Sequence, residues 1–224
     1  MNDIVVRAKG LRRQFGTGQG TVVAIDEATF EIRRGDRIAL TGPSGSGKTS
    51  LLHLIAALDQ PSGGVIEWPA LGEAKDLRPG PVAIAFQGPS LLPPLTVAEN
   101  VALPVLLAGG TEAEAATAAA ALIERLGLSD VASKLPEEIS GGQAQRAGVA
   151  RALMGEPQLI LADEPTGQLD RTSATKLVDV LLQQAEATAA ALVVATHDAE
   201  IAERLPLRWS MTGRIVNTGA SCTY

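Results

Sequence analysis

Residues 37–58 have the sequence RIALTGPSGSGKTSLLHLIAAL, in which an apolar run, a glycine-rich loop and an amphipathic segment follow one another. The apolar run 37–40 predicts a short strand. Leucines and an isoleucine at helical spacing predict a helix that begins at Thr49 and ends before Pro61. A strand, a glycine loop and a helix in this order begin a parallel α/β unit. We therefore expect an α/β fold.

The glycine loop matches the pattern G-x-x-x-x-G-K-[ST], which suits a bound phosphate. Its glycines let successive backbone N–H groups point at phosphate oxygens, and the following helix adds its positive end. We expect Lys48 to reach the β- and γ-phosphates and the Thr49 hydroxyl to ligate Mg²⁺. The loop residues expected to bind nucleotide are Gly42, Pro43, Ser44, Gly45, Ser46, Gly47, Lys48, Thr49 and Ser50.

A second apolar run, LILA at 159–162, ends in the carboxylates Asp163 and Glu164. Open α/β sheets bind ligands where such strands end, so Asp163 is a candidate Mg²⁺ ligand and Glu164 a candidate base for an attacking water. His197 follows the run 192–196 and is a candidate partner of the γ-phosphate. Acidic residues after a strand also serve as helix caps, and a histidine there often has no chemical role.

The remaining pattern predicts two strand-rich regions separated by a helical insert. The sequence from Ser90 to Pro157 has little strand signal, and we expect the chain to be one domain, 1–224. In it, 1–87 and 156–224 form the catalytic core and 88–155 the helical subdomain. Further expected elements are a hairpin-like pair of runs at 22–25 and 28–32 around Asp26–Glu27, helices at 112–128, 142–154 and 174–187, and strands at 159–162, 192–196 and 214–216.

Composition narrows the class of function. The chain has 224 residues, 46% of them hydrophobic and 3% aromatic, and a formal net charge of −6. Nucleic-acid binding uses clustered Lys and Arg or stacked rings, so no direct nucleic-acid partner is expected. The single cysteine, Cys222, cannot form an internal disulfide or a zinc site, which indicates a reducing, cytoplasmic compartment.

No stretch reaches the roughly 18 uninterrupted apolar residues of a membrane helix. The most apolar region, 91–108, is interrupted by three prolines and by Glu99 and Asn100. The N-terminal residues MNDIVVRAKG lack the apolar region of a signal peptide. A role at a membrane would therefore need a separate membrane-spanning partner.

The segment ISGGQ at 139–143 precedes an expected helix, whose free N–H groups and dipole make a second anion site. A second site implies either another phosphate or the same phosphate held from a second chain. This segment resembles the signature, usually LSGGQ, of the ATP-binding cassette (ABC) family. Further resemblances to that family lie in the Q-loop (Gln87 in 85–87, AFQ), the D-loop (167–170, GQLD), the switch histidine (His197) and the A-loop aromatic (Phe15).

The resemblance spans about residues 5–219 and implies an ATPase with a RecA-like parallel core, an N-terminal antiparallel β-subdomain and an inserted helical subdomain. It implies ATP and Mg²⁺ as ligands and two copies packed head to tail, each ATP lying between one phosphate loop and the partner's signature. This sequence departs from the family's usual motifs at Ile139, Phe15 and Gln168. The implied catalytic residues are Lys48, Gln87, Glu164 and His197, the metal ligands are Thr49, Gln87 and Asp163, and the additional nucleotide contacts are Phe15, Ser140, Gly141, Gly142, Gln143 and Asp170.

Within the family, the segments 86–93, 96–101 and 162–167 are most similar to the lipoprotein-release and macrolide-export group. The implied function is to power a separate transmembrane permease at the cytoplasmic face of the membrane. The alternative is a non-transport ABC ATPase of the cell-division, DNA-repair or translation type. The absence of zinc cysteines, the short stretch between Lys48 and Asp163, and the single cassette disfavour the repair, chromosome and translation types respectively.

Overall fold

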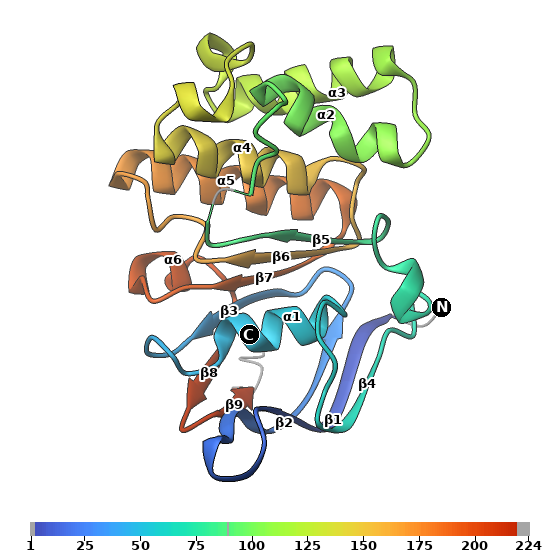
Figure 1. Ribbon diagram of the computed structural model, residues 1–224, viewed down its shortest axis with the longest axis vertical. Coiled ribbons are helices and arrows are strands. Elements are labelled where there is room, and N and C mark those ends of the chain that lie inside the picture. The colour runs from blue at the N-terminus through green and yellow to red at the C-terminus, as the bar shows by residue number, and fades with distance from the viewer. Residues whose placement is uncertain (1–2, 89, 219–224) are drawn as a thin grey trace.

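The computed structural model describes residues 3–88 and 90–218. Cys222 lies outside this part of the chain. A nine-stranded sheet forms its centre, in the order β4-β1-β2-β9-β8-β3-β7-β6-β5 (Figure 1). The strands are β1 Ile4–Phe15, β2 Val22–Arg33, β3 Arg37–Thr41, β4 Gly63–Glu67, β5 Val82–Ala85, β6 Leu159–Asp163, β7 Ala191–Ala195, β8 Leu207–Thr212 and β9 Ile215–Thr218.

The strands β8, β3, β7, β6 and β5 pair in parallel and form the expected parallel core. Both faces of its central strands are covered, so β6 and β7 are buried at every position, as their continuous apolar sequences predict. The parallel register brings Asp163 opposite Ala195, and His197 follows two residues later. The carboxyl ends of β6 and β7 therefore meet at one edge.

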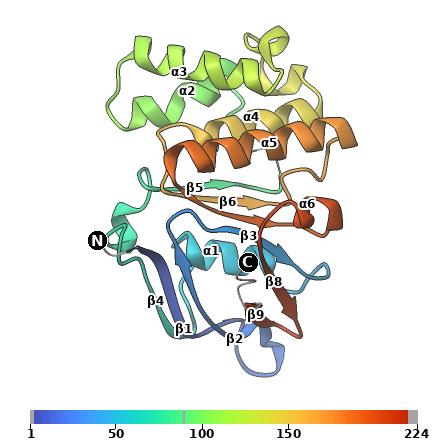
Figure 2. The same ribbon diagram turned by 180° about the vertical axis from the view of Figure 1, so that it is seen from behind.

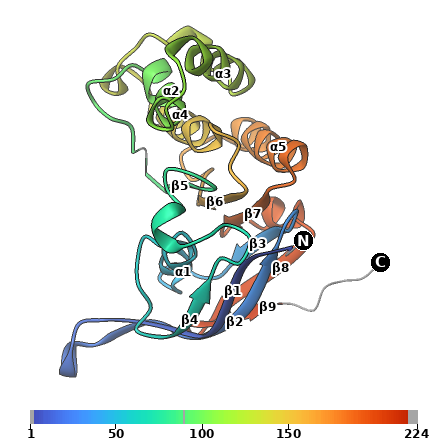
Figure 3. The ribbon, with the colours of Figure 1, turned by 90° about the vertical axis from the view of Figure 1, so that its right-hand side faces the viewer.

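The N-terminal strands form an antiparallel layer, with β1 paired to both β2 and β4. In Figure 3 the far ends of β1 and β2, with the turn that joins them, project from the body of the molecule. The expected hairpin around Asp26–Glu27 is wrong, because β2 runs unbroken through these residues. A shift in register between the pairs Leu11–Ala28 and Arg13–Ile25 leaves Asp26 and Glu27 both exposed, which interrupts the alternation of the strand and imitates a turn.

The helices lie on both sides of the parallel strands. Figures 1 and 2 show α1 on one side and α4 and α5 on the other, with α2 and α3 stacked beyond α4. Their bounds are α1 Lys48–Ile55, α2 Val97–Leu107, α3 Glu112–Arg125, α4 Gly141–Leu153, α5 Arg171–Thr188 and α6 Ala199–Glu203, and short 3-10 helices occupy Gly18–Gly20, Ala74–Asp76, Ser129–Val131 and Pro136–Glu138.

Sequence signals explain where the helices of the insert begin. Thr96 and Thr111 each accept a hydrogen bond from the backbone N–H three residues on, and Glu99 and Glu114 bond back to the threonine N–H groups. Such reciprocal caps satisfy donors that the first turn leaves unpaired. Ser140 caps α4 with Gln143 in the same way.

Two apolar cores lie on the two faces of the parallel sheet. One joins α1 and the antiparallel strands to the sheet, and the other joins α2–α5 to its opposite face. Alternate residues of β7 divide between them, with Leu192 and Val194 in one core and Val193 and Ala195 in the other. In the described residues, none of the helices combines the length and apolar character needed to cross a bilayer.

Candidate active site

A cleft of about 620 Å³ lies at the edge where the parallel strands end. It is lined by the phosphate loop, by the ends of β6 and β7, and by the beginning of β2. The expected site residues that line this cleft are Phe15, Ser44, Gly45, Gly47, Lys48, Thr49, Ser50, Gln87, Asp163, Glu164 and His197. Residues more than 180 positions apart in the sequence are thus brought into one cavity.

Lys48 is buried at the floor of the cleft, where its Nζ donates hydrogen bonds to the carbonyl oxygens of Gly42 (2.8 Å) and Pro43 (3.2 Å). The same Nζ lies 3.7 Å from Oε1 of Glu164. The loop carbonyls hold the ammonium group at the base of the loop, where a phosphate would meet it. Gly42, Pro43 and Ser46 belong to the loop without lining the cleft.

Thr49 and Asp163 are joined across the cleft, because the Thr49 hydroxyl donates to Oδ2 of Asp163 at 2.7 Å. The second carboxylate oxygen, Oδ1, is buried and has no hydrogen-bond partner among residues 3–88 and 90–218. Burial raises the pKa of Asp163, and the neighbouring Glu164 charge adds to this effect. An unpartnered buried carboxylate oxygen beside a hydroxyl is a donor set that fits a hard cation such as Mg²⁺.

Glu164 is buried and adopts a left-handed backbone conformation, with φ of +44°. Its N–H donates to the carbonyl of Ala195 (2.9 Å), and its Oε2 lies 2.8 Å from Nδ1 of His197. A carboxylate oxygen accepts, so we assign the proton of this contact to Nδ1 of His197, which leaves Nε2 as an acceptor. The strained backbone aims the carboxylate at Lys48 and His197 together.

Phe15 is 42% exposed at the mouth of the cleft, so one ring face is open to a planar ligand. The Arg13 guanidinium covers the ring at 4.3 Å from its centroid and is itself paired with Asp59. Arg214, in the turn between β8 and β9, also lines the cleft. No signal in the sequence pointed to either arginine: Arg214 reaches the cleft through the pairing of β9 with β2, and the contact of Arg13 with Phe15 depends on side-chain conformation.

The signature is separated from this cleft. Ser140, Gly141, Gly142 and Gln143 begin α4, and they do not line the cavity that holds Lys48. They lie instead against the D-loop, where a Cβ atom on Gly141 would come within 2.5 Å of Oε1 of Gln168.

Asp170 accepts hydrogen bonds from the backbone N–H (3.0 Å) and the hydroxyl (2.6 Å) of Ser173 and so caps α5. The hydroxyl bond is the largest influence on the pKa of Asp170, which is lowered. The chain therefore carries two separate candidate phosphate sites, the glycine loop in the cleft and the signature at the start of α4.

Comparisons with known proteins agree with this geometry. The sequence model of the ABC transporter family matches residues 25–167. The lipoprotein-releasing system ATP-binding protein LolD of Legionella pneumophila (strain Lens) is 40% identical over 212 residues, covering 92% of this chain and 93% of the relative. The same protein of Hydrogenovibrio crunogenus is 37% identical and covers 95% of both chains.

The solved dimeric structure of the ATP-binding cassette MJ0796 bound to ADP and Pi matches with a TM-score of 0.90 and 29% identity, covering 98% of this chain and 99% of that one. The cbiO1 structure from Clostridium perfringens, with a TM-score of 0.80 and 23% identity over 96% of this chain and 88% of that one, supports the fold. The chain belongs to the ABC transporter family. It is the ATP-binding subunit of an ABC transporter and an ATPase. The expected α/β fold class of an ABC cassette is confirmed.

Proposed function

We propose that two copies of this chain bind Mg²⁺-ATP between them, head to tail, and drive a membrane permease that releases lipoproteins. The observation that carries the dimer is the separation of the signature from the cleft of its own chain. A helix N-terminus with free N–H groups stabilises an anion, and the phosphate of a second copy is the anion that this arrangement would serve. The lipoprotein assignment rests on the LolD relatives.

In this mechanism different residues bind the base, the phosphates and Mg²⁺. Phe15 stacks on the base, and the loop N–H groups with Lys48 hold the phosphates. Thr49, Asp163 and Gln87 would hold Mg²⁺, which when bound supplies positive charge for the phosphate oxygens. Gln87 is exposed at the cleft, and its side chain makes no hydrogen bond with the other described residues, so it is available to a ligand.

Glu164 is placed to accept a proton from the attacking water, since its two carboxylate oxygens lie beside Lys48 and His197, which hold the group in position. The second ring nitrogen of His197, Nε2, would accept a hydrogen bond from the water, and Nδ1–H would donate to the γ-phosphate once the ring turns toward it. Ser140, Gly141, Gly142 and Gln143 of the partner close the site from the other side, and Asp170 supports the D-loop between the two sites.

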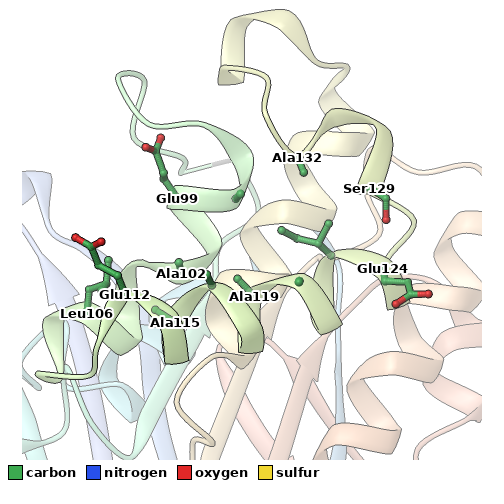
Figure 4. A pocket seen from close by; sticks show the side chains of 13 residues that line it. Glu99, Ala102, Leu106, Glu112, Ala115, Ala119, Glu124, Ser129 and Ala132 are labelled. Carbon is green, nitrogen blue, oxygen red and sulfur yellow. The ribbon is translucent and has the colours of Figure 1, made fainter.

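The permease would dock on the helical subdomain, which we place at 88–155. A groove of about 730 Å³ lies between α2 and α3, with a floor of small apolar side chains (Figure 4). Glu112 and Glu124 lie at opposite ends of this groove, and Glu99 lies at its rim. No lysine or arginine lines the groove among the described residues. The complementary partner is a cytoplasmic helix of the permease with an apolar face and basic residues at its ends.

This arrangement would place the chain at the cytoplasmic face of the membrane, attached through the permease and also contacting it through residues 91–95. Reversing the charges with Glu112→Lys and Glu124→Lys should reduce co-purification of the permease at physiological salt. The control Glu73→Lys changes an exposed glutamate outside the groove and should leave co-purification unchanged. Equal recovery of the permease with all three variants would contradict the docking surface.

A mixing experiment tests the shared site. Lys48→Ala disables the phosphate loop and Ser140→Ala weakens the signature, so each variant alone should hydrolyse ATP slowly. In a head-to-tail dimer of the two variants, one site has an intact loop and an intact signature. Random pairing makes half of the dimers mixed with one good site of two, so activity should recover to about a quarter of the wild-type rate. No recovery on mixing would show that each chain completes its own site.

A further inference from the structure

The segment 92–96, which precedes α2, is held in place by hydrogen bonds to a buried asparagine. Asn100 of α2 is 0% exposed, and its Oδ1 accepts from the backbone N–H of Leu92 at 2.7 Å. Its Nδ2 lies within 3.1 Å of the carbonyl oxygens of Leu92, Leu95 and Thr96. One side chain therefore satisfies the backbone of an irregular segment, 92–96, and fixes its shape.

The same segment is tied to the signature helix by Arg151, in the last turn of α4. The Arg151 guanidinium donates to the carbonyl (2.8 Å) and hydroxyl (2.6 Å) of Ser90 and lies 3.4 Å from Oδ1 of Asn100. Asn100 and Arg151 thus form one connected polar cluster, which we call the Asn100–Arg151 clamp. It joins α2, α4 and the segment 90–96.

A third side chain, Gln145 of α4, contacts the backbone just before Gln87. Gln145 is 2% exposed, and its Nε2 donates to the carbonyl of Phe86 at 3.4 Å. Phe86 immediately precedes Gln87 and Ser90 lies three residues after it, so α4 contacts the backbone before and after the candidate catalytic glutamine. The helix continues without a break from Arg151 back to the signature at Ser140, a distance of about 16 Å at 1.5 Å per residue.

From these contacts we infer that the Asn100–Arg151 clamp makes segment 90–96 and the signature move as one body, with Arg151 as a positioning residue for the signature. This inference rests on the proposed function, in which 91–95 contacts the permease and the signature contacts the partner's nucleotide. A displacement of 90–96 by the permease is carried along α4 to Ser140. Thermodynamic coupling is reciprocal, so closing of the signature on ATP must also displace 90–96.

Reciprocity allows the coupling to be measured without the permease. A fluorophore is attached at Leu92→Cys, whose side chain is 43% exposed, in a Cys222→Ser, Glu164→Gln chain that holds ATP without turnover. ATP should change the emission of this probe. Arg151→Met keeps the length of the aliphatic stem but removes every donor. It should reduce the amplitude of the change at least threefold while leaving the dissociation constant for ATP within twofold.

Matched variants separate coupling from general loss of structure. Arg125→Met removes an arginine of α3 that bonds Gln183 and Gln184 outside the clamp, and its amplitude should equal that of the parent chain. Arg151→Lys can keep one contact to Ser90 and should recover part of the amplitude.

An unchanged amplitude in Arg151→Met, or no ATP response at position 92 in the parent chain, would overturn the inference. Failure of the parent chain to bind ATP would instead overturn the proposed function.

Discussion

The Nδ1 atom of His197 lies 2.8 Å from Oε2 of Glu164, although the two residues follow different strands of the sheet. The other oxygen of the same carboxylate lies 3.7 Å from Nζ of Lys48. Glu164 is therefore held between a donor and a cation. The histidine is more exposed than the carboxylate, so it can turn toward a phosphate while Glu164 stays in place.

The first prediction concerns the base. Glu164→Gln preserves the size of the side chain and removes its capacity to accept a proton, so ATP hydrolysis should slow by about 10²–10⁴-fold. ATP binding should persist, and ATP should convert the chain to a dimer in size-exclusion chromatography. Hydrolysis of ATP by Glu164→Gln at the wild-type rate would exclude Glu164 as the base.

Lys48→Met should weaken ATP binding at least tenfold, because a charge-assisted hydrogen bond to phosphate contributes about 1.5–3 kcal/mol. Titration with a fluorescent ATP analogue measures this loss. Lys75→Met is the control, since Lys75 is exposed and pairs only with Glu73 in the described structure. Equal affinity in the two variants would show that Lys48 does not contact phosphate.

Two glycines of the phosphate loop should respond differently to alanine. Both have positive φ, but a Cβ atom on Gly47 would lie 2.3 Å from the carbonyl oxygen of Ala24, whereas none of the described atoms lies within 4 Å of one on Gly45. A backbone oxygen cannot rotate away, so Gly47→Ala should abolish nucleotide binding and Gly45→Ala should only weaken it. Greater loss in Gly45→Ala would contradict the close approach of β2 to the loop.

The contact between Gly141 and Gln168 predicts a rescue. An alanine at Gly141 would meet Oε1 of Gln168 at 2.5 Å, and the glutamine must leave its place against the signature. We expect Gly141→Ala to lower steady-state ATPase activity, and Gln168→Ala in the same chain to restore part of it by removing the obstacle. If the double variant were no more active than Gly141→Ala, the obstacle would lie elsewhere.

A pH dependence follows from the cap of α3. The backbone N–H of Thr111 is the largest cause of the lowered pKa of Glu114, with the Thr111 hydroxyl second. A carboxylate with a lowered folded pKa stabilises the fold above its unfolded pKa, and this contribution disappears as the pH falls through the folded value. The difference in melting temperature between wild type and Glu114→Gln should therefore be largest above about pH 4.5 and shrink in acid. Glu112→Gln, at an uncapped position of the same turn, is the control.

The sequence predicts the site best where the signal is local. The phosphate loop, the carboxylates after β6 and His197 after β7 are each defined by a few consecutive residues, and the parallel register brings them together. Arg214 could not be predicted in this way, because it reaches the cleft through the pairing of β9 with the distant strand β2. The position of Arg13 over Phe15 depends on the conformation of the two side chains, which no sequence pattern specifies. The bulge that exposes Asp26 and Glu27 shows the same limit, since a single extra residue in β2 imitates a turn.

The roles of Gln87, Asp170 and the four signature residues remain predictions; the mixing experiment tests Ser140, and the Gly141→Ala variants test Gly141. The proposed role of the signature residues needs a partner surface, so the packing of one chain does not determine it. The signature helix begins away from the cleft of its own chain.

Because each proposed ATP site is completed by two copies of the chain, the rate of ATP hydrolysis per copy depends on the concentration of the protein itself. A dilute preparation should lose specific activity, and at low occupancy of the assembled form the total rate should rise with the square of the protein concentration. A scaffold that keeps two copies at high local concentration would remove that dependence. Holding the copies together could thus set the rate of work without altering any residue that contacts the triphosphate.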